Sequence, residues 1–113
     1  MGYYTSYSLQ VLAVETGKPY ALDLAEQAIA ALRDECADAA YALGEDGSAY
    51  QATKWYGREA DLRKFSGPYA DMLFRLDCRG EDGLYKRVYA HAGRAYTVDG
   101  RIEYDPFERS KLK

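Results

Sequence analysis

The sequence has few of the residues that build catalytic and metal centres. It contains two cysteines and a single histidine in 113 residues. Cys36 and Cys78 lie far apart and outside any CxxC spacing, so they indicate neither a disulfide framework nor a zinc cluster, and we expect both to be small core residues. A nucleophilic enzyme needs a base beside its nucleophile. A single histidine, His91, gives little support for an enzyme of this kind.

The spacings typical of common catalytic motifs are also missing. The sequence has no GxSxG, HExxH, P-loop or GxGxxG pattern. The carboxylates of Asp77, Glu81 and Asp82 gather around a turn and could hold a divalent cation, but acidic residues beside glycines are common in hairpin turns. We therefore expect a protein that is not an enzyme and that carries no cofactor and no metal.

Long apolar runs are absent, and so is an overall positive charge. No stretch approaches the roughly 18 apolar residues of a membrane span, and the first residues lack the pattern of a secretory signal, which predicts a cytoplasmic protein that does not bind membranes. The formal net charge is −3, so no basic field surrounds the whole molecule. A site for nucleic acid would have to be local.

Tyrosine is the abundant residue. There are 12 tyrosines against 3 phenylalanines and 1 tryptophan, and a tyrosine combines a large apolar ring with a hydroxyl that can stay hydrated. Such side chains suit half-buried surfaces. The length predicts one domain, residues 1–113, in which the polar tail 107–113 is held loosely.

The first half of the chain predicts a strand and a long helix. Residues 3–14 alternate between two faces, as a strand does. Asp23, followed three residues later by Glu26, forms a capping box, and the helix after it carries one apolar stripe. That stripe consists of Ala25, Ile29, Leu32, Cys36 and Ala39. Residues 39–43 fit either the end of this helix or a short buried strand, and we favour the strand because it returns the chain to the sheet.

The second half predicts a short helix and an antiparallel meander. An irregular aromatic strap holds Tyr50, Trp55 and Tyr56, and a helix over 58–66 ends at Gly67-Pro68. Strands follow at 72–79, 84–91 and 95–98, and Asp99-Gly100 predicts a further hairpin that returns along 101–104.

These elements predict an α+β fold, with a largely antiparallel sheet and one long and one short helix packed on one face. We expect Ile29, Leu32 and Cys36 of the long helix to pack against Phe74 and Leu76 of the sheet.

Charge is distributed unevenly along the chain, and it suggests a first binding surface. Residues 23–61 hold nine acidic and three basic residues, whereas 62–113 hold eleven basic and eight acidic ones. Asp34, Glu35 and Asp38 lie on the helical segment, where a row of carboxylates could mimic phosphates toward a basic partner. In the strap, Trp55 is expected in the core and Tyr50 is the better candidate for a partner contact.

A second candidate surface lies on the outward face of the predicted hairpin. Basic and aromatic side chains interleave there, which lets cations pair with phosphates while rings stack on bases. Its residues are Arg75, Arg79, Tyr85, Arg87 and Tyr89, with His91 at the strand end. The alternative is an ordinary solvated sheet face, since cross-strand Arg and Tyr pairs also stabilise sheets.

Several patches of the chain resemble a family of small bacteriophage and prophage accessory proteins without an assigned biochemical role. The patches are Tyr3–Leu9, Lys54-Trp55-Tyr56 with Asp61-Leu62 and Phe65-Ser66, Leu73–Leu76, and Gly80-Glu81. The chain departs from the family at Gly57–Ala60, where its members carry an acidic, histidine-containing stretch. The resemblance implies stoichiometric binding to a component of a bacterial host, as anti-CRISPR proteins and other anti-defence inhibitors do.

Three hypotheses follow from the sequence. The first is a phage-type inhibitor that binds a host defence protein or protein–RNA complex through Asp34, Glu35, Asp38 and Tyr50. The second is a small nucleic-acid or nucleotide binding module that uses the arginines and tyrosines of the meander. The third is a phage structural or assembly component.

Overall fold

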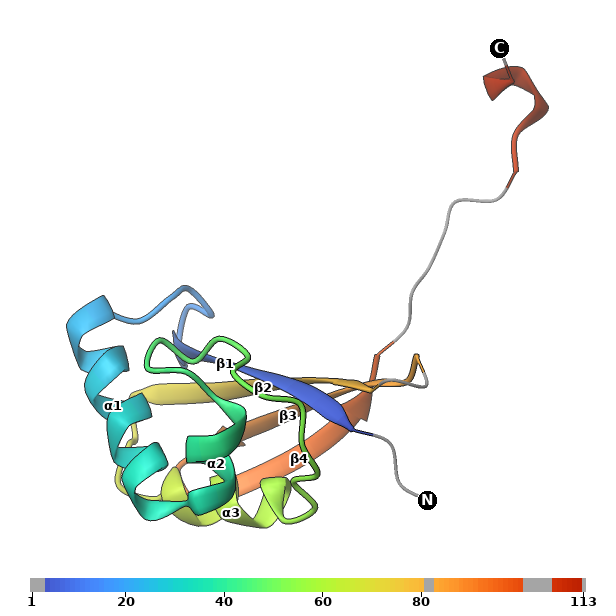
Figure 1. The fold of residues 1–113 in the computed structure, drawn as a ribbon. Coiled ribbons are helices and arrows are strands. Elements are labelled where there is room, and N and C mark those ends of the chain that lie inside the picture. Colours follow the sequence, from blue (N-terminus) through green and yellow to red (C-terminus); the bar gives the residue numbers. More distant parts are fainter. Residues whose placement is uncertain (1–3, 81–82, 101–106, 113) are drawn as a thin grey trace.

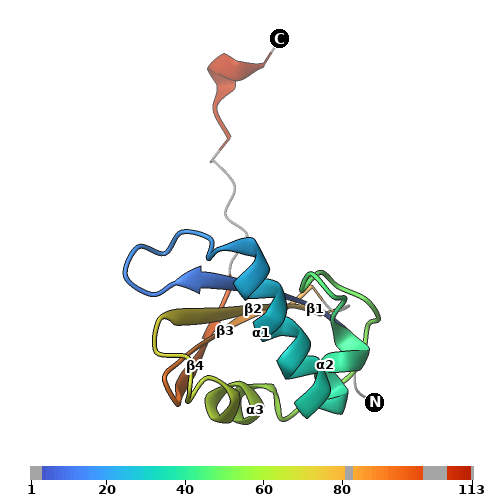
Figure 2. The same cartoon turned by 90° about the vertical axis from the view of Figure 1, so that its left-hand side faces the viewer.

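A computed structural model describes residues 4–80, 83–100 and 107–112. Four strands form one antiparallel sheet in the order β1-β2-β3-β4, with helices α1, α2 and α3 on one of its faces (Figures 1 and 2). The predicted α+β class is therefore confirmed. The strands are β1 (Thr5–Ala13), β2 (Met72–Gly80), β3 (Tyr85–His91) and β4 (Arg94–Asp99). The helices are α1 (Leu22–Glu35), α2 (Ala37–Ala42), α3 (Arg58–Phe65) and a 3-10 turn at Arg109–Lys111.

The core lies between the sheet and the helices. Alternation along the strands turns one set of side chains toward the helices, and the register places Leu9 opposite Leu76 and Val11 opposite Phe74. As predicted, Ile29 and Leu32 of α1 are buried in one cluster with Phe74 and Leu76, and Cys36 packs half-buried against it. Each fully buried large apolar side chain contributes roughly 1.5–3 kcal/mol, so this cluster dominates the stability of the fold.

The predicted capping box is wrong. Helix α1 begins at Leu22 with Ala21 as its N-cap, and no side chain caps it, while Asp23 lies inside the first turn. The start of the helix is set by tertiary pairing instead. The backbone N–H of Tyr20 donates to the Val11 carbonyl at 3.0 Å, and Pro19 forms a bridge with Leu12. These contacts fix the chain against β1 immediately before the helix, and the exposed first turn leaves its free N–H groups to water.

The strand favoured at 39–43 is also wrong. The chain breaks at Cys36, which is extended, and resumes as the separate helix α2, in which Ala39 and Ala42 are fully buried. Only Leu43 makes a β-bridge, with Ala49. Alanine has the highest helix propensity, and its small side chain lets α2 pack closely. The strap comprises residues 44–57, which follow α2, and it reaches β1. The Leu9 N–H donates to the Gly47 carbonyl at 2.7 Å, and Thr53 pairs with Thr5.

The meander is held by tight turns. Ala92 and Gly93 both have positive φ, 47° and 83°, which is typical of a two-residue hairpin turn between β3 and β4. The predicted return of the chain along 101–104 lies outside the described residues. In the described part of the tail, residues 107–112, no side chain is buried. None of the helices in the described ranges is long and apolar enough to cross a membrane.

Candidate functional site

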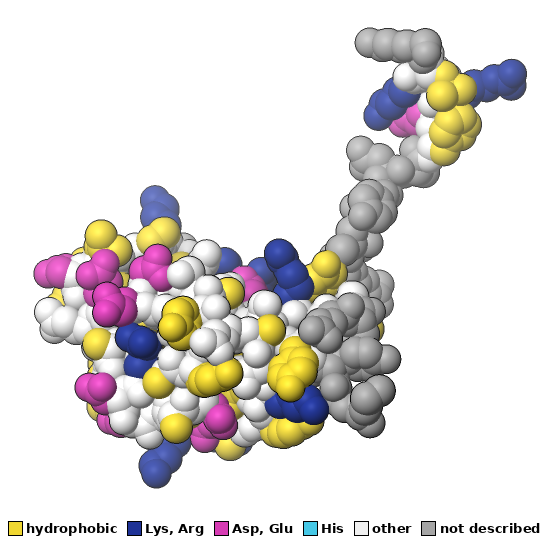
Figure 3. Space-filling view, in the orientation of Figure 1, with side chains coloured by type: hydrophobic (Ala, Val, Ile, Leu, Met, Phe, Trp, Pro, Cys, Tyr) yellow, Lys and Arg dark blue, Asp and Glu magenta, His cyan; other side chains and the backbone are white. Residues whose placement is uncertain are grey.

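The acidic surface expected from the sequence lies where α1 ends and α2 begins. Asp34 and Glu35 belong to the last turn of α1, Asp38 belongs to the first turn of α2, and all three side chains are exposed. None of them forms an ion pair with another described residue. Acidic side chains on the visible side of the molecule gather mainly at the end that carries α1 (Figure 3). Because carboxylates at a helix C-terminus are repelled by the helix dipole, the stability of α1 does not explain Asp34 and Glu35.

Tyr50 lies at the C-terminal end of α2, whereas Asp38 lies in the first turn of that helix. The backbone N–H of Tyr50 donates to the carbonyl of Ala42, the last residue of α2, at 2.9 Å, and 64% of the residue is exposed. Tyr41 of α2 is exposed as well, at 52%, and the sequence reasoning did not single it out. The sequence signal for Tyr41 is helical periodicity: if Ala39 and Ala42 form the buried side of a helix, Tyr41 falls on its exposed side.

The arginines and tyrosines of the second surface all lie on the face of the sheet that the helices leave uncovered, which we call the open face. The register aligns Gln10, Arg75, Tyr89 and Tyr96 in one row across the strands. The next row contains Ser8, Asp77, Arg87 and Val98, and the one after it contains Ser6, Arg79 and Tyr85. The structure therefore brings the five predicted residues of this surface together and adds Tyr96, Asp77 and Gln10.

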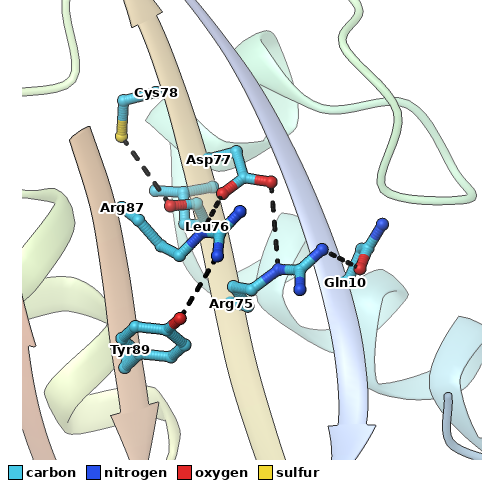
Figure 4. A network of polar contacts seen from close by, with 7 residues as sticks. All are labelled: Gln10, Arg75, Leu76, Asp77, Cys78, Arg87 and Tyr89. Atoms are coloured by element: carbon cyan, nitrogen blue, oxygen red, sulfur yellow. Dashed lines mark hydrogen bonds and ion pairs between the residues drawn. The ribbon is translucent and has the colours of Figure 1, made fainter. Parts of the chain in front are cut away.

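A polar network holds the middle of the open face (Figure 4). Arg87 donates from Nε to Asp77 Oδ1 at 2.6 Å and from Nη1 to the Tyr89 hydroxyl at 3.3 Å. The hydrogen bond to Tyr89 contributes most to a raised pKa of the Arg87 guanidinium, and the hydrogen bond to Asp77 contributes next. The other carboxylate oxygen, Oδ2, lies 3.8 Å from Arg75 Nε, and Arg75 also donates to Gln10 Oε1. One carboxylate is thus shared between two guanidinium groups.

Aromatic rings occupy the β3 and β4 side of the open face. The rings of Tyr89 and Tyr96 lie 5.3 Å apart at an interplanar angle of 35°. The guanidinium of Arg79 lies 5.8 Å from the centre of the Tyr85 ring, a cation–π contact. Tyr96 is 59% exposed, which leaves its ring open to a stacking partner. Arg75 and Arg79 on β2 and Arg87 on β3 therefore lie beside a group of tyrosines on β3 and β4.

The charge of the open face differs in sign from that of the whole chain. Arg75, Arg79, Arg87 and Arg94 stand against Asp77, a local charge of +3. Arg79 is exposed and makes no ion pair with any described residue. An open hollow of about 630 Å³ lies at this end of the sheet, and its lining includes Arg79 and Tyr85 of the open face and Lys86 and Asp99 of the opposite face. That volume is within the range of small-ligand sites.

Trp55 is structural, as expected. It is fully buried, its Nε1 donates to Asp61 Oδ2 at 2.7 Å, and its backbone N–H donates to the Tyr7 hydroxyl at 3.1 Å. The thiol of Cys36 also donates to Asp61 Oδ2, at 3.5 Å. Asp61 therefore joins the strap, the junction of α1 with α2, and α3. Sequence reasoning missed this role because it depends on contacts between segments that no local pattern reveals.

The two cysteines behave as unreactive thiols. Burial raises the pKa of Cys36, and it raises the pKa of Cys78 to about 11. Because the thiolate is the nucleophilic form, both side chains are poor nucleophiles at neutral pH.

His91 has a structural contact. Its Nδ1 lies 3.0 Å from the Met72 carbonyl oxygen, and because that oxygen only accepts, Nδ1 carries the proton. This contact ties the end of β3 to the start of β2. No group of three or more histidine, cysteine or acidic side chains within the described ranges could hold a metal ion. Glu81 and Asp82, considered with Asp77 as cation ligands, lie outside those ranges.

Comparison of the chain with protein-family models, with curated proteins and with solved structures gives no match.

Proposed function

We propose that this protein is a non-catalytic binding protein whose open face takes single-stranded nucleic acid. The observation that carries the proposal is that arginines of β2 and β3 lie beside tyrosines of β3 and β4 on one face of the sheet, with α1, α2 and α3 on the opposite face. Sheet faces that expose aromatic rings stack unpaired bases, and nearby cations neutralise the phosphates. Paired bases are already stacked on each other, so a single strand fits this surface better than a duplex.

The layout of the open face suggests how such a strand lies. Strands rise about 3.3 Å per residue, so Arg75 and Arg79, four positions apart on β2, are separated by roughly 13 Å along the strand. Tyr89 and Tyr85 lie opposite them on β3, one strand spacing of about 4.8 Å away. A nucleic-acid backbone that runs along β2 would therefore place bases toward Tyr89 and Tyr85, with Arg87 between the two rings.

The net charge of −3 lowers the affinity for nucleic acid but does not prevent binding at the open face. Affinity for a polyanion depends on the potential at the surface it approaches, and the open face carries a local charge of +3. The acidic residues of α1 and α2 lie on the other side of the sheet. We expect moderate affinity with a clear dependence on salt.

Fluorescence anisotropy with labelled oligo-uridine, oligo-thymidine and a duplex tests the proposal. Tyr96→Ala should weaken single-strand binding by about 1–3 kcal/mol, the contribution of one stacked base, and leave the salt dependence unchanged. Arg79→Ala should weaken binding and reduce the slope of log K against log salt by ~0.7, the value for one phosphate contact on a single strand. Arg109→Ala, in the tail, is the matched control. Equal affinity for all variants, or a preference for the duplex, would contradict the proposal.

A second candidate function rests on the acidic surface. Three exposed carboxylates without ion pairs to described residues at the junction of α1 and α2, and the exposed ring of Tyr50 at the other end of α2, support docking onto a basic protein surface. This is how an inhibitor of a host defence complex, of the kind implied by the phage-family resemblance, would act. Reversal of Asp34, Glu35 and Asp38 to lysine should abolish such an interaction but leave RNA binding unchanged or strengthen it. Arg79→Ala should have the opposite pattern, so the two variants separate the two functions.

A further inference from the structure

Asp77 has an unusual position for a surface intended for phosphates. Among the described residues of the open face it is the only acidic one, and it lies in the middle row between Ser8 and Arg87. Its side chain is 36% exposed, so a ligand on this face would meet the carboxylate. A ligand with phosphate groups would be repelled by it, unless the carboxylate has a role in the site.

The carboxylate contacts the two arginines through different oxygens. Oδ1 accepts from Arg87 at 2.6 Å, and Oδ2 faces Arg75 Nε at 3.8 Å. Figure 4 shows Asp77 between the two guanidinium groups. A phosphate that bridged these arginines would present two oxygens in a similar way, since guanidinium groups bind carboxylates and phosphates with the same geometry.

We infer that Asp77 occupies the place of a ligand phosphate between Arg75 and Arg87 and thereby limits the affinity of the open face. The inference rests on the proposed function and concerns the control of that same site. Of the three arginines on β2 and β3, Arg79 is the one that can make the first contact in the free protein, because it forms no ion pair with a described residue. The other two arginines reach a phosphate only after they leave the carboxylate.

The geometry predicts that the arginines stay in place when Asp77 loses its charge. Arg87 keeps its hydrogen bond to the Tyr89 hydroxyl, and Arg75 keeps its hydrogen bond to Gln10. Asn at position 77 has nearly the same shape and retains one acceptor oxygen for Arg87. Asp77→Asn therefore removes the competing charge while two independent contacts still orient the guanidinium groups.

The test is anisotropy of labelled oligo-uridine against the wild type and Asp77→Asn over a series of salt concentrations. We expect the variant to bind roughly three- to tenfold more tightly, with a steeper salt slope, because one or two further arginines pair with phosphates. Asp23→Asn is the matched control: Asp23 is exposed in the first turn of α1, on the side of the sheet opposite the open face. That variant should leave the affinity unchanged.

The affinity of variants in an Arg87→Ala background distinguishes repulsion of the ligand by Asp77 from a purely structural role of Asp77. Without Arg87 the carboxylate loses its closer partner and repels the ligand, so binding should weaken more than in Arg79→Ala. In the Arg87→Ala background, Asp77→Asn should restore part of the affinity. If Asp77 only supports the fold, the double variant binds no better than Arg87→Ala, and the inference is wrong.

The outcomes distinguish the inference from the function on which it rests. If Arg79→Ala weakens RNA binding but Asp77→Asn binds equally or more weakly than the wild type, the open face binds RNA and the inference about Asp77 is overturned. If neither the wild type nor Asp77→Asn binds the oligonucleotide, both are overturned. Thermal unfolding checks each variant, and Asp77→Ser replaces Asp77→Asn if the latter does not fold.

Discussion

Two glycines provide a direct test of how the strap docks on the sheet. Gly17 and Gly47 both have positive φ, 70° and 86°, so alanine is strained at either position. Their surroundings differ. A Cβ at Gly17 would meet nothing within 4 Å, whereas a Cβ at Gly47 would lie 2.3 Å from the Leu9 carbonyl oxygen and 3.2 Å from Ile29 Cδ1. The comparison of Gly17→Ala with Gly47→Ala therefore isolates the contact of the strap with β1.

The magnitudes follow from these surroundings. At Gly17, a left-handed alanine costs about 1–2 kcal/mol, of which the lower entropy of the unfolded chain offsets about 0.4–1 kcal/mol. Gly47→Ala carries the same terms. In addition, the strap must move away from β1, which breaks the 2.7 Å hydrogen bond from Leu9 to the Gly47 carbonyl beside the buried core. An unsatisfied buried group adds about 1–3 kcal/mol, so we expect roughly 1 kcal/mol for Gly17→Ala and about 2–4 kcal/mol for Gly47→Ala.

Urea unfolding followed by tryptophan fluorescence measures both values. Trp55 is the single tryptophan of the chain and is fully buried, so its emission reports the loss of the core. The slopes of the unfolding transitions should agree between variants, which allows the free energies to be compared. Equal destabilisation by the two substitutions would refute the reasoning, because it would mean that Gly47 does not approach Leu9 as described.

Two further predictions concern the buried side chains. Trp55→Phe removes the hydrogen bond to the Asp61 carboxylate and leaves a smaller ring in the core, so we expect the free energy of unfolding to fall by about 3–5 kcal/mol. Tyr50→Phe, at an exposed position, should lower it by less than ~1 kcal/mol. Urea unfolding followed by circular dichroism measures both values. Burial raises the pKa of Cys78 from 9.0 to about 11, so the folded state keeps the neutral thiol longer than the unfolded state does. The stabilisation is therefore complete below pH 9 and is lost as the pH rises toward 11, and the free energy of unfolding should fall more steeply there in the wild type than in Cys78→Ala.

The parts of the fold that the sequence predicts well are those set by local patterns. Alternation with a period of two identifies the strands, and the same alternation assigns Arg75 and Arg87 to the outward face of the sheet. The turn at Ala92-Gly93 has two residues, and such a turn fixes the register of its strands. That register puts Tyr96 opposite Tyr89, so the sequence contains a signal for Tyr96 that the prediction of this surface did not use.

The parts that the sequence does not predict depend on contacts between distant segments. The start of α1 is set by the pairing of Tyr20 with Val11, which no capping rule contains. Asp77 has the sequence surroundings of an ordinary acidic residue near a turn, and only the register of β2 with β3 places it opposite Arg87. Asp61 gives no local signal at all, since its partners Trp55 and Cys36 come from two other segments.

The separation of charge follows from the layered architecture and bears on how a partner would approach. Helices α1, α2 and α3 all lie on one face of the sheet (Figure 2). The thickness of the sheet and the core therefore separates the acidic residues of α1 and α2 from the arginines of the open face. Salt screens charges over about 8 Å at physiological ionic strength, so each side acts largely independently on a molecule near it. A polyanion is then repelled from the helical side and attracted to the open face, which favours one orientation of encounter. The acidic composition of the chain is thus compatible with a nucleic-acid site, because the same charges that lower the net attraction direct the ligand to the face where the arginines and tyrosines lie.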